Sequence, residues 1–271
     1  AEGYKQFLDE GKTERECCAY VEAAAKAAGY EAFDFGRRLK AGDKIYYNNR
    51  GKNMYLIKVG TENIAKDGIR IIASHIDSPR LDLKQLPLYE SEGVALGKTH
   101  YYGGLRKYQW AAIPLALHGV VALKDGTTVQ VKVGEDESDP VFYISDLLPH
   151  LAAKQNQKPL GNAIEGEQLN IWFGNIPYTA ATEDDEKTVK NHVLHLLNDK
   201  YGITEADFMS AELSMVPAFK AKDVGFDRAL LGSYGHDDRV CAYPAWKACL
   251  DETSDQHTVM VILADKEEIG S

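Results

Sequence analysis

Two apolar runs end abruptly in ionisable side chains, and this feature constrains the fold of the 271-residue chain most. The first run, IRIIAS (69–74), leads into SHIDSP (74–79), and the second, TVMVILA (258–264), leads into DKEE (265–268). Uninterrupted aliphatic and β-branched runs are typical of strands that are buried on both faces of a sheet. We therefore expect both runs to be central strands of an α/β sheet.

The ionisable residues after these runs predict a functional site at one edge of that sheet. In open α/β sheets, sites form in the crevice beyond the carboxyl ends of the strands. Two strands that end in ionisable residues could therefore direct those side chains to a common place. A third acidic cluster, GHDDR (235–239), precedes a predicted helix over 239–252 and is a candidate for the same site.

The remaining patterns predict an α/β domain that is interrupted by a β-rich insert. A helix is expected over 13–30, with Thr13 and Glu16 as a capping box, and two strands over 44–60. From about residue 87 the chain is rich in glycine and aromatic residues, and it contains a predicted hairpin at Asp125-Gly126 and a helix over 183–202. We expect an α/β domain formed by residues 1–86 and 226–271, and an insertion domain over 87–225.

The net charge of −10 argues against nucleic acid or an anionic membrane as the main partner. No run reaches the about 18 apolar residues of a membrane helix, and the N-terminal segment carries no signal-peptide core. The four cysteines form no CxxC pair, which is typical of buried thiols in the cytoplasm. We therefore expect a cytoplasmic protein without nucleic-acid or membrane partners.

Each ionisable cluster has a metal-binding and a structural interpretation. In an extended segment the side chains of His75 and Asp77 share one face, which suits a histidine ligand with an acid that orients its imidazole. A histidine and an acid that only cap a loop also fit this pattern, because it is short and common. Asp237 and Asp238 could share a carboxylate between two metals, with Arg239 nearby to neutralise or orient the second acid. They could also simply cap the following helix.

Glu267 and Glu268 are the carboxylates that a structural role explains least well. Carboxylates at the end of a buried strand must be solvated, paired or metal-bound, because burying an unpaired charge is costly. Adjacent residues point in different directions, so one glutamate could bind metal while its neighbour deprotonates water; a surface loop is the alternative. One imidazole with several carboxylates suits zinc or manganese, and a dinuclear site could activate water and polarise a carbonyl.

The three clusters together resemble a known family. ASHIDSPRLDLK, GHDDRVCAY and ADKEEIGS are similar to the metal-binding segments of the aspartyl aminopeptidase or aminopeptidase I family, and YYGGLRKYQW, LALHGVV and LPHLA are similar to its second domain. The resemblance implies a three-layer catalytic domain with a mixed sheet and an insertion domain that serves oligomerisation. It also implies two Zn²⁺ per site, with Co²⁺ or Mn²⁺ as alternatives, and removal of N-terminal Asp or Glu from peptides by dimers that assemble into a dodecamer.

The resemblance also implies a role for each site residue. It makes His75 a zinc ligand, Asp77 the acid behind that ligand, and Asp237 the bridging aspartate. Glu267 would be the general base and Glu268 a second zinc ligand. In sequence position, His150 matches loosely a histidine of the family that reaches a neighbouring subunit's active site. The resemblance therefore makes His150 a candidate substrate-binding residue.

Two departures from the family pattern leave other functions open. Family chains continue well beyond EEIGS and supply a further aspartate and a final histidine ligand, so we expect this chain to lack the C-terminal part. The segment RKYQW is also more polar than the matching segment of eukaryotic members, which bears on the acidic preference. The alternatives are a related zinc amidohydrolase, such as a deacylase or carboxypeptidase, and an inactive assembly fragment.

Overall fold

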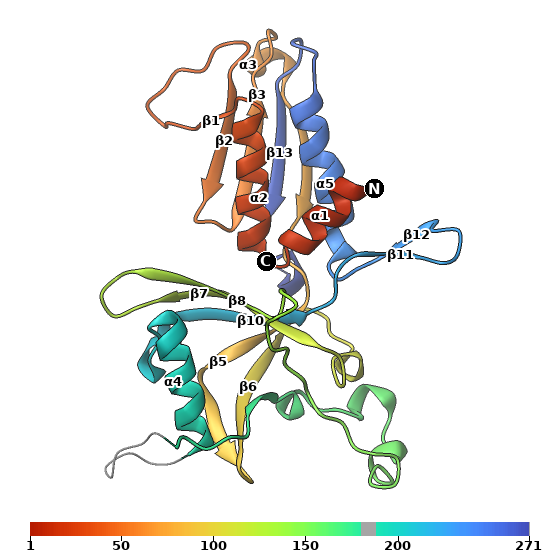
Figure 1. Cartoon of the computed structure of the whole chain (residues 1–271). Helices are drawn as coiled ribbons and strands as arrows, with labels where there is room; N and C mark the ends of the chain where they lie inside the picture. Colours follow the sequence, from red (N-terminus) through yellow and green to blue (C-terminus); the bar gives the residue numbers. More distant parts are fainter. Residues whose placement is uncertain (180–187, 271) are drawn as a thin grey trace. The chain divides into compact units, whose positions relative to one another are not determined.

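The computed structural model describes residues 1–179 and 188–270, and the chain divides into two compact units (Figure 1). The first unit combines residues 1–78 with residues 220–271, and the second comprises residues 79–219. The sequence patterns place the insert at 87–225. The compact unit starts earlier because β5 (Arg80–Ser91) pairs with β6 (Val94–Tyr102) from its first residue.

The first unit contains a five-stranded mixed sheet in the order β1-β2-β3-β13-β4. Strand β13 is central: it runs antiparallel to β3 and parallel to β4. The predicted α/β class with a mixed sheet is therefore confirmed. The strands of this sheet are β1 (Glu31–Ala32), β2 (Lys44–Asn49), β3 (Asn53–Lys58), β4 (Arg70–His75) and β13 (Val259–Ala264).

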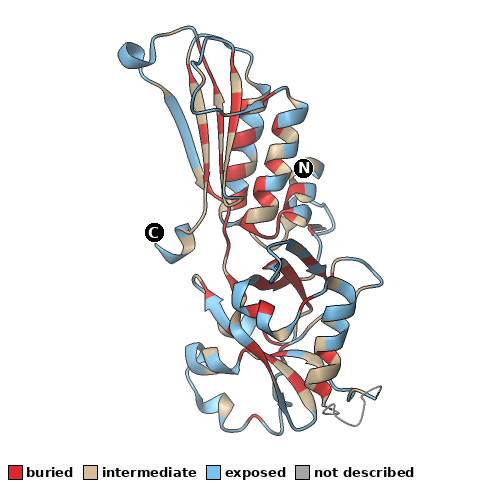
Figure 2. Ribbon diagram, turned by 90° about the vertical axis from the view of Figure 1, so that its left-hand side faces the viewer, coloured by how far each residue is buried: buried red, intermediate tan, exposed pale blue. Residues whose placement is uncertain are grey.

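Three helices of the first unit cover one face of its sheet (Figure 2). They are α1 (Glu2–Glu10), α2 (Glu14–Ala27) and α5 (His236–Asp251); the unit also has the single turn α3 (Ile64–Asp67) and a hairpin of β11 (Lys222–Val224) and β12 (Leu230–Gly232). Within residues 1–179 and 188–270, no comparable helical layer covers the other face. The described chain thus supplies two of the three expected layers.

The core between this sheet and its helices is apolar and aromatic. Phe7 of α1 and Trp246 of α5 pack edge to face, and Leu56 and Leu263 are fully buried beneath the helices. Helix α2 starts where the sequence predicts, because the Thr13 hydroxyl accepts the amide of Glu16 while the Glu16 carboxylate accepts the amide of Thr13. Residues of α1, α2 and α5 therefore share one core with residues of β2, β3 and β13.

The second unit contains a six-stranded antiparallel sheet in the order β8-β7-β10-β5-β6-β9. This confirms the expected β-rich texture and the hairpin at Asp125-Gly126, which joins β7 to β8. The predicted helix over 183–202 is found as α4 (Val189–Tyr201), and residues 183–187 lie outside the described part. The further strands are β7 (Leu115–Ala122), β8 (Thr128–Val133), β9 (Ile171–Gly174) and β10 (Ala211–Pro217).

Strand β4 differs from the expectation that it is central. In the described part of the chain it pairs only with β13 and forms an edge of the sheet. Ile71 and Ile72 are 53% and 43% exposed, so an apolar run suited to burial lies at the surface.

Among the helices of the described residues, none is long and apolar enough to cross a membrane.

Candidate metal centre

The topology of the first unit brings the three ionisable clusters together. His75 is the last residue of β4, and its partner on the neighbouring parallel strand is Ala264, the last residue of β13. Glu268 follows in a 3₁₀ helix (Glu267–Ile269), and Asp237 lies at the start of α5. The prediction that the carboxyl ends of these two strands lie side by side is confirmed.

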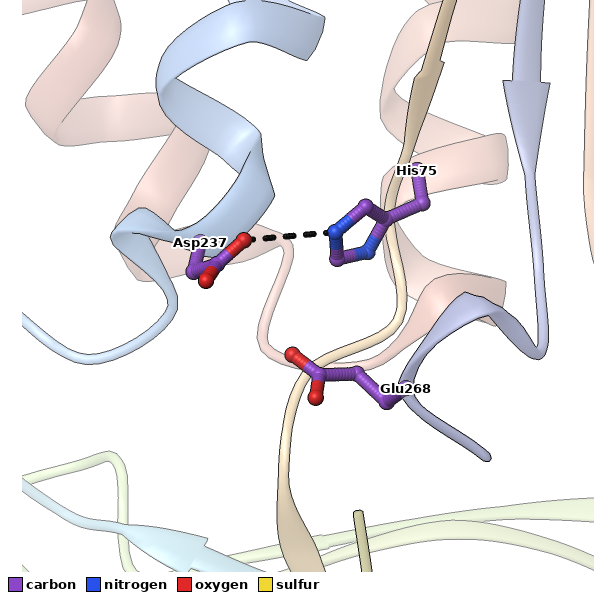
Figure 3. A group of neighbouring side chains, drawn as sticks. All are labelled: His75, Asp237 and Glu268. Atoms are coloured by element: carbon purple, nitrogen blue, oxygen red, sulfur yellow. Dashed lines mark ion pairs between the residues drawn. The ribbon is translucent and has the colours of Figure 1, made fainter. Parts of the chain in front are cut away.

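One imidazole and two carboxylates converge in this place. The ligand atoms of His75, Asp237 and Glu268 all lie within 4.8 Å of one another. His75 Nε2 is 3.3 Å from Asp237 Oδ1, and Figure 3 shows the three side chains pointing toward a common centre. His75 is buried, Glu268 half-buried and Asp237 exposed, so the group is open to solvent on one side.

Asp77 contacts two of the three converging segments, the one that carries His75 and the one that carries Glu268. Its carboxylate is completely buried, and its Oδ1 lies 3.3 Å from His75 Nδ1. The same carboxylate accepts the backbone amide of Glu267 at 3.3 Å and that of Glu268 at 3.2 Å. The Asp77 backbone carbonyl lies 3.1 Å from the same Nδ1 of His75, so Asp77 contacts the imidazole through both its carboxylate and its main chain. Asp77 also fixes the turn that carries both glutamates, which the sequence alone did not indicate.

The start of α5 is irregular where it approaches His75. Asp237 and Asp238 have non-helical dihedral angles, and the peptide bond between them is cis. The Ser78 hydroxyl donates to the Asp237 carbonyl at 2.9 Å, and Asp238 Oδ2 accepts the His75 amide at 3.4 Å. Ser78 and Asp238 thus connect the strand end to the helix start; the sequence patterns gave Asp238 a metal-binding or helix-capping role and did not single out Ser78.

The electrostatics of the group favour a cation. Burial raises the pKa of the Glu268 carboxyl, and the negative charge of Asp237 adds to this rise. Burial lowers the pKa of His75, but the charge of Asp77 and a hydrogen bond to its backbone outweigh burial, and the pKa is raised. Burial and the neighbouring carboxylates both disfavour the charged form of Glu268, and a divalent ion among these side chains would offset both effects.

The other predicted residues take different positions. Glu267 is exposed, with its Oε2 at 3.4 Å from His75 Nε2, so it borders the group without being buried in it. His150 is an exposed turn residue of the unit 79–219 and is not a member of the group. Arg239 does not pair with Asp238 as expected: it is completely buried and donates to the backbone carbonyls of Lys12 and Ile76.

The donor set fits a zinc-type ion. Imidazole and carboxylate ligands suit Zn²⁺ or Mn²⁺, and the contact of Asp77 with His75 Nδ1 leaves Nε2 as the ligand atom. Three donors are sufficient for a single ion with an open position. Among the described residues, this is the one group of three or more such side chains, so a second ion would need additional donors.

Comparisons with known proteins agree with this donor set. A family model described as aminopeptidase I zinc metalloprotease (M18) matches residues 7–271. A curated protein of Clostridium acetobutylicum, a probable M18 family aminopeptidase 1, is 50% identical over 272 residues, which cover 99% of this chain and 58% of the relative. The chain therefore spans less than two thirds of that relative's length.

Solved structures show the same fold. The crystal structure of an M18 family aminopeptidase from Thermotoga maritima matches with a TM-score of 0.92 and 41% identity, over 100% of this chain and 58% of that chain. A structure of the Saccharomyces cerevisiae mApe1 dodecamer matches with a TM-score of 0.76 and 20% identity, over 100% of this chain and 61% of that chain. At that identity the yeast protein shares the fold alone.

Proposed function

The chain belongs to the aminopeptidase I zinc metalloprotease (M18) family, and from this premise we propose that it carries part of the active site of a metalloaminopeptidase. The observation that carries the proposal is the convergence of His75, Asp237 and Glu268 within 4.8 Å. These three residues would hold zinc, and Asp77 would orient His75. The reaction would release single residues from the N-termini of peptides.

The residues around the metal group would divide the chemistry between them. Bound zinc would polarise the scissile carbonyl and lower the pKa of water. Glu267 is the candidate general base, because it is exposed beside the group while its neighbour Glu268 is half-buried within it. It would accept a proton from the attacking water and deliver it to the leaving amine, for which a carboxylate at the open side is suitably placed.

We further propose the finer properties that the family resemblance implies. The complete site would hold two metal ions, with donors beyond the three converging residues, and would prefer N-terminal Asp or Glu. The protein would act in the cytoplasm on peptides, and it would assemble from copies of its own chain, as the yeast dodecamer does. Contacts through the insert, and His150 as a residue that reaches substrate, belong to this assembly proposal.

The two adjacent glutamates provide the sharpest test. Glu268→Gln should weaken Zn²⁺ or Co²⁺ binding to this chain, because it removes a ligand charge. Glu267→Gln should leave metal affinity within about threefold of wild type, while lowering turnover of the protein that carries this chain about 10²–10⁴-fold. Glu31→Gln, an exposed carboxylate on β1, is the control for both measurements. Full activity of Glu267→Gln would refute the assignment of the base.

A substrate panel separates aminopeptidase from the other candidates. Asp-, Glu-, Leu- and Lys-anilides should be cleaved in a chelator-sensitive reaction, with the acidic pair cleaved faster. Preferential cleavage of N-acylated substrates would instead indicate a zinc amidohydrolase. If the protein that carries this chain assembles, as seen by light scattering, yet binds less than one equivalent of metal, an assembly role would be indicated and the catalytic proposal contradicted.

A further inference from the structure

Arg239 is a completely buried arginine two residues after the candidate ligand Asp237. Its Nη2 donates to the carbonyl of Lys12 at 3.0 Å and to the carbonyl of Ile76 at 3.2 Å. Lys12 lies in the short connection between α1 and α2, and Ile76 lies between His75 and Asp77. One guanidinium therefore joins the α1–α2 connection, the end of β4 and the start of α5.

The surroundings of Arg239 are shaped to admit its side chain. Gly235 has a φ of +81°, and a Cβ at this position would lie 2.0 Å from Nη1 of Arg239. The ring of Tyr234 faces the guanidinium, with 5.5 Å between Cζ and the ring centroid. On another side lies Cys17, where burial raises the thiol pKa to about 11 and keeps it neutral. A bulkier residue at position 235 would expel the side chain.

Packing alone does not account for a charge in this place. Within the described residues, Nε and Nη1 of Arg239 have no hydrogen-bond partner, and burial of an incompletely bonded charge is unfavourable. An apolar side chain of similar size commonly fills such a position with equal or greater stability. An apolar residue would leave the buried carbonyl of Ile76, at the point where β4 ends and the ligand-bearing segment begins, to the weak thiol donor of Cys17, whose Sγ lies 4.0 Å away.

We propose that Arg239 is a positioning residue of the metal centre, which holds the segment His75–Asp77 at a fixed place relative to Asp237 before metal binds. The proposal rests on the metal-binding function proposed above. Through Ile76, the guanidinium restrains the ligand His75 on one side and Asp77 on the other. Because Asp77 in turn holds the amides of Glu267 and Glu268, the restraint extends to all three ligand-bearing segments.

Loss of this restraint should affect the site more than the fold. The amide of Ile76 donates to Ala264, and the amide of His75 donates to Asp238. Both amides lie in the segment that Arg239 restrains, so their hydrogen exchange measures how firmly that segment is held. Residues that orient metal ligands from behind commonly contribute 10–100-fold in metal affinity, so an effect of about that size is expected here.

The test compares four variants of the chain. Arg239→Met removes the donors at similar size, and Gly235→Ala displaces the guanidinium while retaining its charge. Arg239→Lys can still reach one carbonyl and should restore part of the effect. Cys249→Ala, a buried residue later in α5, is the control for general destabilisation of that helix. Amide exchange of residues 74–78 is measured in metal-free protein, and Co²⁺ affinity is measured by titration with the visible absorption of the bound ion.

Arg239→Met and Gly235→Ala should each speed exchange in 74–78 by about tenfold and weaken Co²⁺ binding by about 10–100-fold, whereas Cys249→Ala should change neither. Exchange and affinity that match the Cys249→Ala control would overturn the positioning role. If wild type binds no Co²⁺, the proposed metal function fails. The restraint is then judged by exchange alone, and unchanged exchange in Arg239→Met would refute it.

Discussion

The Asp77 carboxylate accepts amide hydrogen bonds from Glu267 and Glu268 while one of its oxygens faces the imidazole of His75. The contact with His75 could be predicted from sequence, because alternate residues of an extended segment share a face. The contacts with the two glutamates could not, because they join positions 190 and 191 residues apart. Local spacing therefore predicted the pair His75 and Asp77, and only the fold revealed how Asp77 connects that pair to the two glutamates.

Asp77→Asn tests this connection. The amide group keeps the size of the side chain but removes its charge and replaces one acceptor by a donor, which would face a backbone N–H. We expect a stability loss of about 1–3 kcal/mol and a metal affinity lowered about 10–100-fold. Asp67→Asn on α3, which also loses a carboxylate that accepts a backbone amide, is the control and should leave metal affinity unchanged. Equal metal affinity in both variants, measured by titration, would contradict the role of Asp77.

A second residue-scale prediction concerns pH and Asp207 in the second unit. Hydrogen bonds from the hydroxyl and the amide of Thr204 lower the pKa of Asp207. Because the folded pKa is lowered, the stabilisation is present above the unfolded value of about 3.9 and is lost as the pH falls through the folded value. Asp207→Asn should lower the melting temperature at pH 7, and its difference from wild type should shrink toward pH 3. The exposed Asp199→Asn is the control, and a constant difference at all pH values would refute the mechanism.

At the scale of elements, the predictions that depend on local chemistry agree with the structure, whereas those that depend on distant neighbours do not always agree. The capping box at Thr13 fixes the start of α2, and the turn at Asp125-Gly126 fixes the hairpin β7–β8. The position of β4 in its sheet, by contrast, depends on residues far away in the sequence. A run of Ile and Ala predicts a strand, but whether that strand is central depends on which other strands pair with it.

The exposed edge of β4 predicts self-association of the isolated chain. Ile71 and Ile72 point to opposite faces of an edge strand, and exposed apolar edge strands pair readily with other chains. Ile72→Lys should reduce concentration-dependent light scattering and the binding of a hydrophobic dye, at a cost of about 0.5 kcal/mol or less in stability. Ile64→Lys, which changes an exposed isoleucine on α3, should leave both signals unchanged. Scattering by Ile72→Lys equal to wild type would contradict this role of the edge.

At the scale of the whole molecule, the order of elements could be predicted but the extent of each unit could not. The change from helix-containing to glycine- and aromatic-rich sequence indicates an interruption of the α/β domain. It does not indicate where the second unit begins, because β5 has the composition of the preceding segment but pairs with β6 and β10. Sheet membership is decided by pairing over long sequence distances, which composition does not report.

The topology of the second unit predicts that residues 79–219 fold alone. The first and last long strands of this unit are neighbours, since Asp82 of β5 pairs with Ser214 of β10, so both ends of the segment leave one side of a single sheet. The isolated segment should give a β-rich circular dichroism spectrum and a cooperative thermal transition. It should bind no Zn²⁺, because His75, Asp237 and Glu268 all lie outside it.

A pair of glycine variants distinguishes a native fold from a collapsed chain in that experiment. Gly119 and Gly126 both have positive φ angles, but a Cβ at Gly119 would lie 1.9 Å from the Glu212 carbonyl oxygen, whereas a Cβ at Gly126 would meet nothing within 4 Å. Gly126→Ala should therefore cost only about 1–2 kcal/mol from its backbone conformation, whereas Gly119→Ala should force β7 away from β10 and abolish the transition. A segment that melts without cooperativity, or that tolerates both changes equally, would show that the second unit depends on the rest of the chain for its fold.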